Sequence, residues 1–173
     1  LDENAPALLT LLGDEAPHTF LVLLQNNAEL RPSGGFIGNI LLFELNDGYL
    51  TKTELSDVYQ YDHQLDDKIQ PPEQLRILVD RWYLRDSNYS PHFPLSAQTA
   101  ADFLEKENGP GVDSVIAIDQ NILEDVLALT GPVEIPGLKA PLSDKNASRV
   151  LSYIIESKLT GAQEPKAVLR SVL

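Results

Sequence analysis

The sequence predicts an α/β fold, a three-layer sandwich in which a mixed β-sheet lies between helices. Three observations lead to this prediction. Residues 19–25 form an apolar run of strand length, Asn46-Asp47-Gly48 is a turn between two strand-like segments, and 114–135 has the pattern of a strand–helix–strand unit. That last connection is long enough for a right-handed crossover between parallel strands. With 173 residues, the chain is expected to form a single α/β domain over 1–173.

The first elements follow from local signals. A helix is expected from Asn4, which can cap it, to Gly13, which follows its end. The continuous apolar run 19–25 is shorter than a typical helix, so we expect a strand buried on both faces. The composition of 26–35 predicts a loop. Residues 36–45 and 49–55 are expected to pair as a hairpin, because Asn, Asp and Gly tolerate positive φ at the turn.

The later elements alternate between helices and strands. They are an acidic loop over 56–70, a helix begun by Pro71-Pro72 and carrying Leu75, Leu78, Val79 and Trp82, an irregular loop over 85–94, a helix over 97–107 capped by Ser96, a strand over 114–118, a helix from Asp119 to Gly131, a short strand over 133–135, a helix capped by Ser143 and closed by Gly161, and a last helix from Glu164-Pro165.

Composition excludes several function classes. The 26 acidic and 13 basic residues give a net charge of −13, which disfavours nucleic-acid binding and repels anionic membrane surfaces. The absence of Cys excludes thiol catalysis and Cys-zinc sites, and the three His residues form no HExxH motif. No apolar run reaches membrane-spanning length. The chain has no Met, so we expect a processed or excised part of a larger protein.

The segment 26–39 is the most unusual in the chain, because polar residues crowd the end of a buried strand. Its candidate ligand-binding residues are Asn26, Asn27, Glu29, Arg31, Ser33 and Asn39. In one interpretation Arg31 and backbone N–H groups grip an anionic or sugar-like ligand. In the other, Glu29 pairs locally with Arg31 and the Asn side chains hydrogen-bond the loop. The Gly-rich run 34–38 superficially resembles a nucleotide-binding loop, but it leads into a strand instead of a helix and lacks a following Lys. We therefore expect the Gly pair to permit close backbone packing and not to bind a nucleotide.

Two further stretches carry candidate chemistry. Asp57, Asp62, Asp66 and Asp67 could hold a hard cation such as Mg²⁺, or simply form a solvated acidic loop, and Asp57 is the candidate metal ligand. The segment 81–94 supplies Arg81, Arg85, Asp86 and Asn88 as candidate site residues. A helix C-terminus alone would favour the two Arg residues. Trp82 fits the apolar face and is expected in the core.

The motifs LVLLQNNAELRPSGGFIGN (21–39) and WYLRDSNYSPHFP (82–94) resemble a bacterial family of membrane-anchored proteins that carry a domain of unknown function. The resemblance runs from about residue 7 to the end. That family is in turn similar to the LytR–CpsA–Psr proteins, extracytoplasmic transferases that move glycopolymers from a polyprenyl-pyrophosphate carrier onto peptidoglycan. The resemblance implies their mixed sheet between helices, a bacterial envelope location and an anchor to the cytoplasmic membrane outside this chain.

The resemblance implies catalytic positions that this chain fills only in part. The relatives' Ser-Asp-Thr falls on Ile37-Gly38-Asn39, which has no carboxylate, and their Pro-Arg-Asp falls on Leu55-Ser56-Asp57, which has no Arg. Arg31, Arg81 and Arg85 could supply positive charge together with Mg²⁺. Arg149 and Arg170 are candidate matches to later Arg residues of the relatives.

Two functions therefore stay open. One is a non-catalytic binding or assembly module for an envelope glycopolymer or its lipid-pyrophosphate carrier. The alternative is a phosphotransferase that attaches glycopolymers to the cell wall, with phosphate bound by Arg31 and Arg85, and with Asp57 and Asp86 serving a metal or a proton. Both require segments 26–39 and 81–94 to lie together around one pocket.

Overall fold

The computed structural model describes residues 4–62, 69–77, 79–119, 121–135, 138 and 140–150. The chain divides into two compact units, Leu1–Ile118 and Asp119–Leu173, and each is described by itself. The expectation of one domain over the whole chain stays a prediction.

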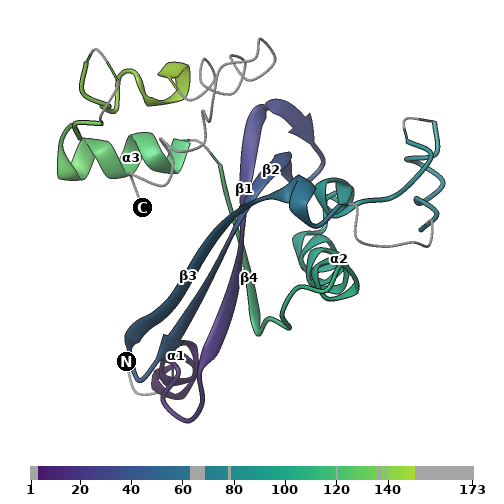
Figure 1. Cartoon of the computed structure of the whole chain (residues 1–173), viewed down its shortest axis with the longest axis horizontal. Helices are drawn as coiled ribbons and strands as arrows, with labels where there is room; N and C mark the ends of the chain where they lie inside the picture. Colours follow the sequence, from purple (N-terminus) through teal and green to yellow (C-terminus); the bar gives the residue numbers. More distant parts are fainter. Residues whose placement is uncertain are drawn as a thin grey trace. The chain divides into compact units, whose positions relative to one another are not determined.

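The first unit is built on a four-stranded sheet with the strand order β3-β2-β1-β4 (Figure 1). The strands are β1 (His18–Arg31), β2 (Gly34–Asn46), β3 (Tyr49–Asp57) and β4 (Ser114–Asp119). β1 and β2 are antiparallel, as are β2 and β3. β4 begins beside the start of β1, because the His18 ring lies 2.8 Å from the Ser114 hydroxyl and the Asp113 N–H donates to the Thr19 carbonyl. The sheet is therefore mixed.

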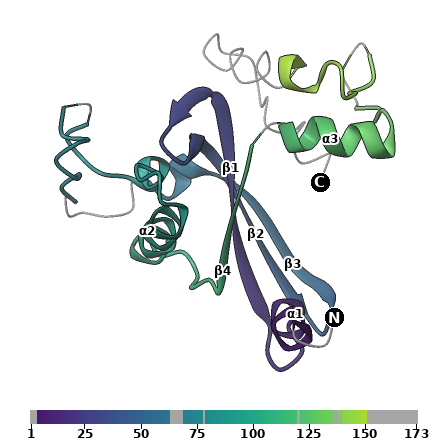
Figure 2. The same ribbon diagram turned by 180° about the vertical axis from the view of Figure 1, so that it is seen from behind.

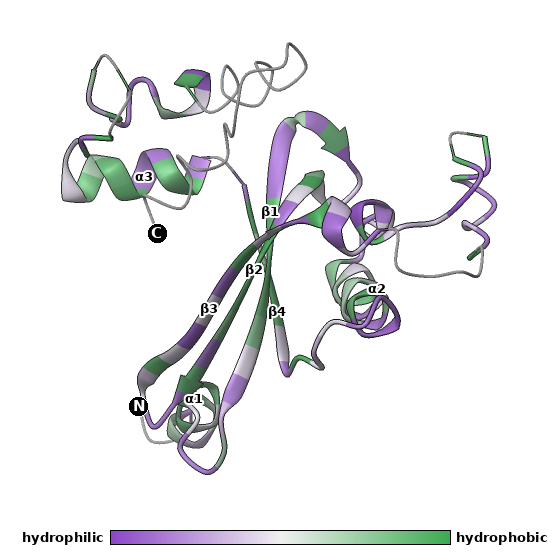
Figure 3. Ribbon diagram, in the orientation of Figure 1, coloured by the Kyte–Doolittle hydropathy of each residue, from purple (hydrophilic) through white to green (hydrophobic). Residues whose placement is uncertain are grey.

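The apolar run in β1 forms the centre of the sheet. Four consecutive residues of β1, Phe20 to Leu23, are buried, which confirms a strand covered on both faces. Figure 3 shows this run as a hydrophobic stretch between more polar ends. On one face, the Phe20 ring stacks on that of its register partner Phe43, with centroids 4.5 Å apart. Such cross-strand pairs fix the register of the sheet.

The β2–β3 turn confirms the predicted hairpin and also anchors helix α1 (Ala5–Leu12). Asp47 and Gly48 both have positive φ, at 53° and 77°. Their N–H groups donate to the carbonyls of Gly13 and Leu12 at the end of α1. A side chain at Gly13 would overlap the Leu45 carbonyl, so glycine is required at this contact. Figures 1 and 2 show α1 at this end of the sheet.

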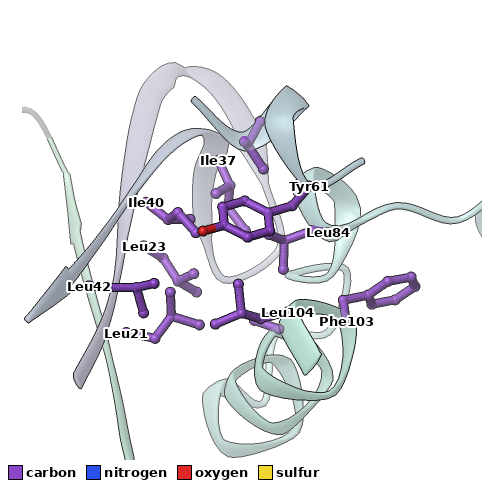
Figure 4. Packing of buried hydrophobic residues seen from close by; sticks show 11 residues of the cluster. Leu21, Leu23, Ile37, Ile40, Leu42, Tyr61, Leu84, Phe103 and Leu104 are labelled. Atoms are coloured by element: carbon purple, nitrogen blue, oxygen red, sulfur yellow. The ribbon is translucent and has the colours of Figure 1, made fainter. Parts of the chain in front are cut away.

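The main core lies between the sheet and helix α2 (Phe93–Lys106). Figure 4 shows its residues, with Leu21, Leu23, Ile37, Ile40 and Leu42 from the strands and Phe103 and Leu104 from α2. Tyr61 and Leu84 also point into this cluster. Tyr61 directly follows η1 (Val58–Gln60) and Leu84 is the first residue of η2 (Leu84–Asp86), so both single-turn 3-10 helices are fastened to the same core.

Three sequence predictions in this unit are wrong. The expected loop over 26–35 is the paired end of the β1–β2 hairpin, where Leu30 and Arg31 face Gly35 and Gly34. The expected helix after Pro71-Pro72 is absent from the described residues, in which 73–77 form only turns. Ser96 does not cap α2 but lies inside it, and its hydroxyl donates to the Ser90 carbonyl at 3.0 Å.

The second unit contains helix α3 (Asn121–Thr130). Asp119 accepts from the Asn121 N–H at 2.9 Å, as the predicted cap requires. The expected strand over 133–135 is reduced to one bridge between Val133 and Leu142. Its small core consists of Leu127, Ile135, Leu142 and Ala147. The helix expected after Ser143 is described only to residue 150, so Gly161, Glu164-Pro165 and Arg170 lie outside the described residues.

The α/β class and the mixed sheet are confirmed. In the first unit α2 covers one face of the sheet, so helices on both faces and the LytR–CpsA–Psr-like arrangement stay predictions. Among the described residues, no helix has both the length and the hydropathy needed to cross a bilayer.

Candidate functional site

The two polar segments singled out in the sequence lie side by side. The Ser33 hydroxyl at the β1–β2 tip donates to the Asn88 carbonyl at 3.3 Å. The buried side chain of Asn88 returns a bond of 2.7 Å from Nδ2 to the Gly35 carbonyl. These bonds join residues more than fifty positions apart, so the fold brings segments 26–39 and 81–94 together. That the segments line a shared pocket stays a prediction.

The Gly34-Gly35 pair is required for close packing beneath this junction. A side chain at Gly34 would overlap the Gln25 amide, and one at Gly35 would overlap the Asn26 carbonyl. The Gly35 N–H donates to Gln25 Oε1 at 3.4 Å, while its carbonyl accepts from Asn88. Gly35 therefore sets the orientation of both amides. Gln25 Nε2 and Asn88 Oδ1 are left buried with no hydrogen-bond partner among the described residues.

Arg85 is held by a buried carboxylate. Its Nη1 donates to Asp62 Oδ2 at 2.7 Å, and its backbone N–H donates to Asp62 Oδ1 at 3.4 Å. The Asp62 side chain is 0% exposed and that of Arg85 is 20% exposed. A second carboxylate, Asp86, lies 3.7 Å from Nε. The positive charge of Arg85 is thus compensated within the protein.

The pKa directions reflect this burial. Burial raises the pKa of Asp62 above its ordinary value, and the bond from Arg85 opposes the rise. Burial also raises the pKa of Asp86, while Arg85 and then Arg31 act to lower it. For Arg85, burial is outweighed by Asp62 and Asp86, so its pKa is raised.

Aromatic rings flank the same guanidinium. Arg85 Cζ lies 3.9 Å from the centre of the Tyr83 ring and 5.2 Å from that of Tyr59. Arg81 Cζ lies 5.2 Å from the Tyr83 centre. Rings and guanidinium groups therefore alternate, in the order Tyr59, Arg85, Tyr83, Arg81. These distances lie within the range of cation–π contacts.

The hairpin-end residues bond partly to one another. Asn26 Nδ2 donates to Glu29 Oε1, and its Oδ1 accepts from the Ala28 N–H, both at 3.1 Å. The partner found for Glu29 is thus Asn26, whereas Arg31 donates to the Leu30 carbonyl and lies over the Phe36 ring. The expected local hydrogen bonding by Asn26 is present. Asn27 is half-buried on β1, and Asn39 pairs in register with Leu24 and Asp57.

Two of the four candidate aspartates, Asp57 and Asp62, lie in the described residues, and each bonds to a group of the protein. The Asp57 side chain caps η1 by accepting from the Tyr59 N–H at 3.1 Å. Asp62 is buried and bonded to Arg85, so the solvated-loop interpretation is wrong for this residue, whereas a role in a cation site stays a prediction. Within 4–62, 69–77, 79–119 and the described part of the second unit, no group of three His, Cys, Asp or Glu residues could hold a metal ion. Asp66 and Asp67 lie outside the described residues.

Trp82 lies against the core, as predicted. Its ring makes edge contacts with Phe103 and Tyr89, at 5.1 Å and 5.3 Å, and its Nε1 donates to the Asp86 carbonyl. Sequence reasoning did not identify Tyr59, Tyr83 or the Asp62–Arg85 pair. The only available signal was the density of Tyr and Asp residues just after the third strand.

Residues 15–154 match the family described as "Protein of unknown function (DUF4012)", and the chain belongs to that family. No curated protein and no solved structure shows a significant match to the chain.

Proposed function

We propose that this DUF4012 domain is a non-catalytic binding or assembly module for a bacterial envelope glycopolymer or its lipid-pyrophosphate carrier. The ligand class, the extracytoplasmic location and an anchor outside this chain come from the resemblance of segments 21–39 and 82–94 to envelope proteins. We extend the proposal to the fold, with a LytR–CpsA–Psr-like sheet that has helices on both faces. The main structural support for a non-catalytic role is the ion pair between Arg85 and the buried Asp62.

This pairing favours binding over phosphoryl transfer. Transfer requires positive charge aimed at the phosphate oxygens as negative charge develops on them. Arg85 instead directs its charge to Asp62 at 2.7 Å and to Asp86 at 3.7 Å. The Asp57 carboxylate is likewise engaged, because it caps η1. Of the three candidate catalytic residues, Arg85, Asp86 and Asp57, each is thus engaged with other groups of the protein, which supports binding over transfer.

The hairpin end retains groups suited to a sugar ligand. Arg31 is half-buried over the Phe36 ring, at 5.2 Å from its centre, and Glu29 is exposed beside it. Guanidinium, carboxylate and amide groups together can donate to and accept from sugar hydroxyls. Because the Ser33 hydroxyl donates to the Asn88 carbonyl, a ligand at the hairpin end would lie beside the second polar segment.

Binding and turnover can be measured on the same purified chain. Peptidoglycan sacculi carrying glycopolymer, and lipid vesicles with or without undecaprenyl pyrophosphate, are sedimented with the protein, and phosphate release is followed with and without Mg²⁺. We expect co-sedimentation without phosphate release. Arg31→Ala should weaken it several-fold, whereas Lys52→Ala, which removes an exposed positive charge on β3, should not.

Two results would overturn the proposal. If the chain binds neither the sacculi nor the lipid, it is not a module for these ligands. If Mg²⁺-dependent phosphate release is lost in Arg31→Ala but retained in Lys52→Ala, the alternative phosphotransferase function is correct.

A further inference from the structure

The half-exposed ring of Tyr59 is backed by a guanidinium that is itself fixed. Tyr59 lies on η1, directly after β3, and is 50% exposed. Arg85 lies over one face of this ring and over the Tyr83 ring. Arg85 covers one face, and because half of the residue remains exposed, a ligand can reach the ring from solvent.

The surroundings fix the backbone of Tyr59 and the guanidinium that lies over its ring. Asp57 accepts from the Tyr59 N–H, and Asp62 holds both the side chain and the backbone N–H of Arg85. Tyr61 and Leu84, which adjoin the two 3-10 helices, point into the main core (Figure 4). Because the backbone and the neighbouring guanidinium are already fixed, little of this surface has to become ordered when a ligand binds, which favours affinity.

The local charge selects the kind of ligand. Asp62 and Asp86 compensate Arg85, and the whole chain carries a net charge of −13. A polyanion would therefore gain little at this ring. An uncharged sugar ring presents C–H groups that pack against the negative face of an aromatic ring, and its hydroxyl groups stay in water.

We propose that Tyr59, backed by Arg85 and Tyr83, is a stacking platform for uncharged sugar rings. We call these three residues the Tyr59 platform. The inference deepens the proposed function, on which it rests, by assigning the ligand class as neutral sugar rather than phosphate and by naming the residue that stacks on it.

The experiment titrates the purified full chain with chitohexaose, a neutral sugar probe, and with a chondroitin sulfate hexasaccharide as a charged probe of similar size. Tyr59→Ala should weaken chitohexaose binding about tenfold, which corresponds to about 1.4 kcal/mol. Tyr59→Phe keeps the ring and should bind within about twofold of the natural chain. Tyr49→Ala is the matched control, because Tyr49 is a 74% exposed tyrosine at the opposite end of β3. The sulfated probe should bind more weakly than chitohexaose.

The outcomes separate the platform from the proposed function. If Tyr59→Ala binds chitohexaose as tightly as the natural chain, the platform is refuted. The same holds if the natural chain sediments with sacculi but ignores chitohexaose, and in both cases the proposed function stands. Tighter binding of the sulfated probe overturns the neutral ligand class. If the natural chain binds neither chitohexaose nor sacculi nor the lipid carrier, both proposals fail.

Discussion

Replacement of Arg85 by Met tests whether the Asp62–Arg85 pair is structural. The variant leaves a carboxylate that is 0% exposed without its charged partner, which was bonded at 2.7 Å. Breaking one side of a buried pair costs about 3–5 kcal/mol. The backbone N–H at residue 85 still donates to Asp62, and Met retains part of the contact with Tyr83, so we expect about 3 kcal/mol at pH 7.

The stability lost in Arg85→Met should decrease as the pH falls. Burial raises the pKa of Asp62, and without Arg85 to oppose the rise its pKa moves further up. A raised folded-state pKa contributes stability below the unfolded value, and this contribution is lost as pH rises through the folded value. The difference in unfolding free energy between Arg85→Met and the natural chain should therefore be smaller at pH 4.5 than at pH 7.

Urea denaturation followed by circular dichroism measures these differences, and a double-mutant cycle with Asp62→Asn isolates the pair. Asp62→Asn should relieve part of the stability lost in Arg85→Met, because the fully buried carboxylate of Asp62 is then removed. Lys52→Met, which breaks the exposed Lys52–Glu44 pair on the same sheet, should not change stability measurably. A loss below about 1 kcal/mol at pH 7, or no relief from Asp62→Asn, would refute a structural role.

Three further changes probe the junction of the polar segments. Asn88→Ala removes a buried 2.7 Å bond to the Gly35 carbonyl and should cost about 1–3 kcal/mol by urea denaturation. Gly35→Ala places a methyl group on the Asn26 carbonyl and should lower the melting temperature, at a cost of about 1–3 kcal/mol in the same assay. Because burial raises the pKa of Asp86, Asp86→Asn should be more stable than the natural chain at pH 7, and this gain should shrink as pH falls toward 4.

Elements with strong local signals could be predicted, whereas those set by distant contacts could not. The β2–β3 hairpin was predictable because Asp and Gly tolerate positive φ, which Asp47 and Gly48 adopt in the turn. Residues 26–31 have a loop-like composition, yet pairing of Leu30 with Gly35 extends β1 through them. Trp82 is positioned by the packing of its ring on Phe103 and by the hydrogen bond from its backbone N–H to the Ile69 carbonyl. The helix-like spacing of Trp82 from the preceding apolar residues was therefore misleading.

The candidate site was predictable as two neighbouring segments but not in its detailed interactions. Polar density alone identified 26–39 and 81–94, and the Ser33–Asn88 bond joins them. The partner of Arg85 could not be deduced, because Asp62 is one of four aspartates within 57–67 and local sequence does not distinguish which of them is buried. Only the fold decides which carboxylate is buried, since burial depends on Tyr61 and Leu84 entering the core.

The attachment of α1 to the β2–β3 turn determines how the sheet would respond to mechanical force. The amides of Asp47 and Gly48 tie the last turn of α1 to a hairpin that is distant in sequence. A mechanical force applied at residue 4 would load these two hydrogen bonds before it could separate β1 from the neighbouring strands. Proteolytic removal of residues 4–13 would break both hydrogen bonds and expose the N–H groups of Asp47 and Gly48 to solvent. The tip of the β2–β3 hairpin would then be the first part of the sheet to open.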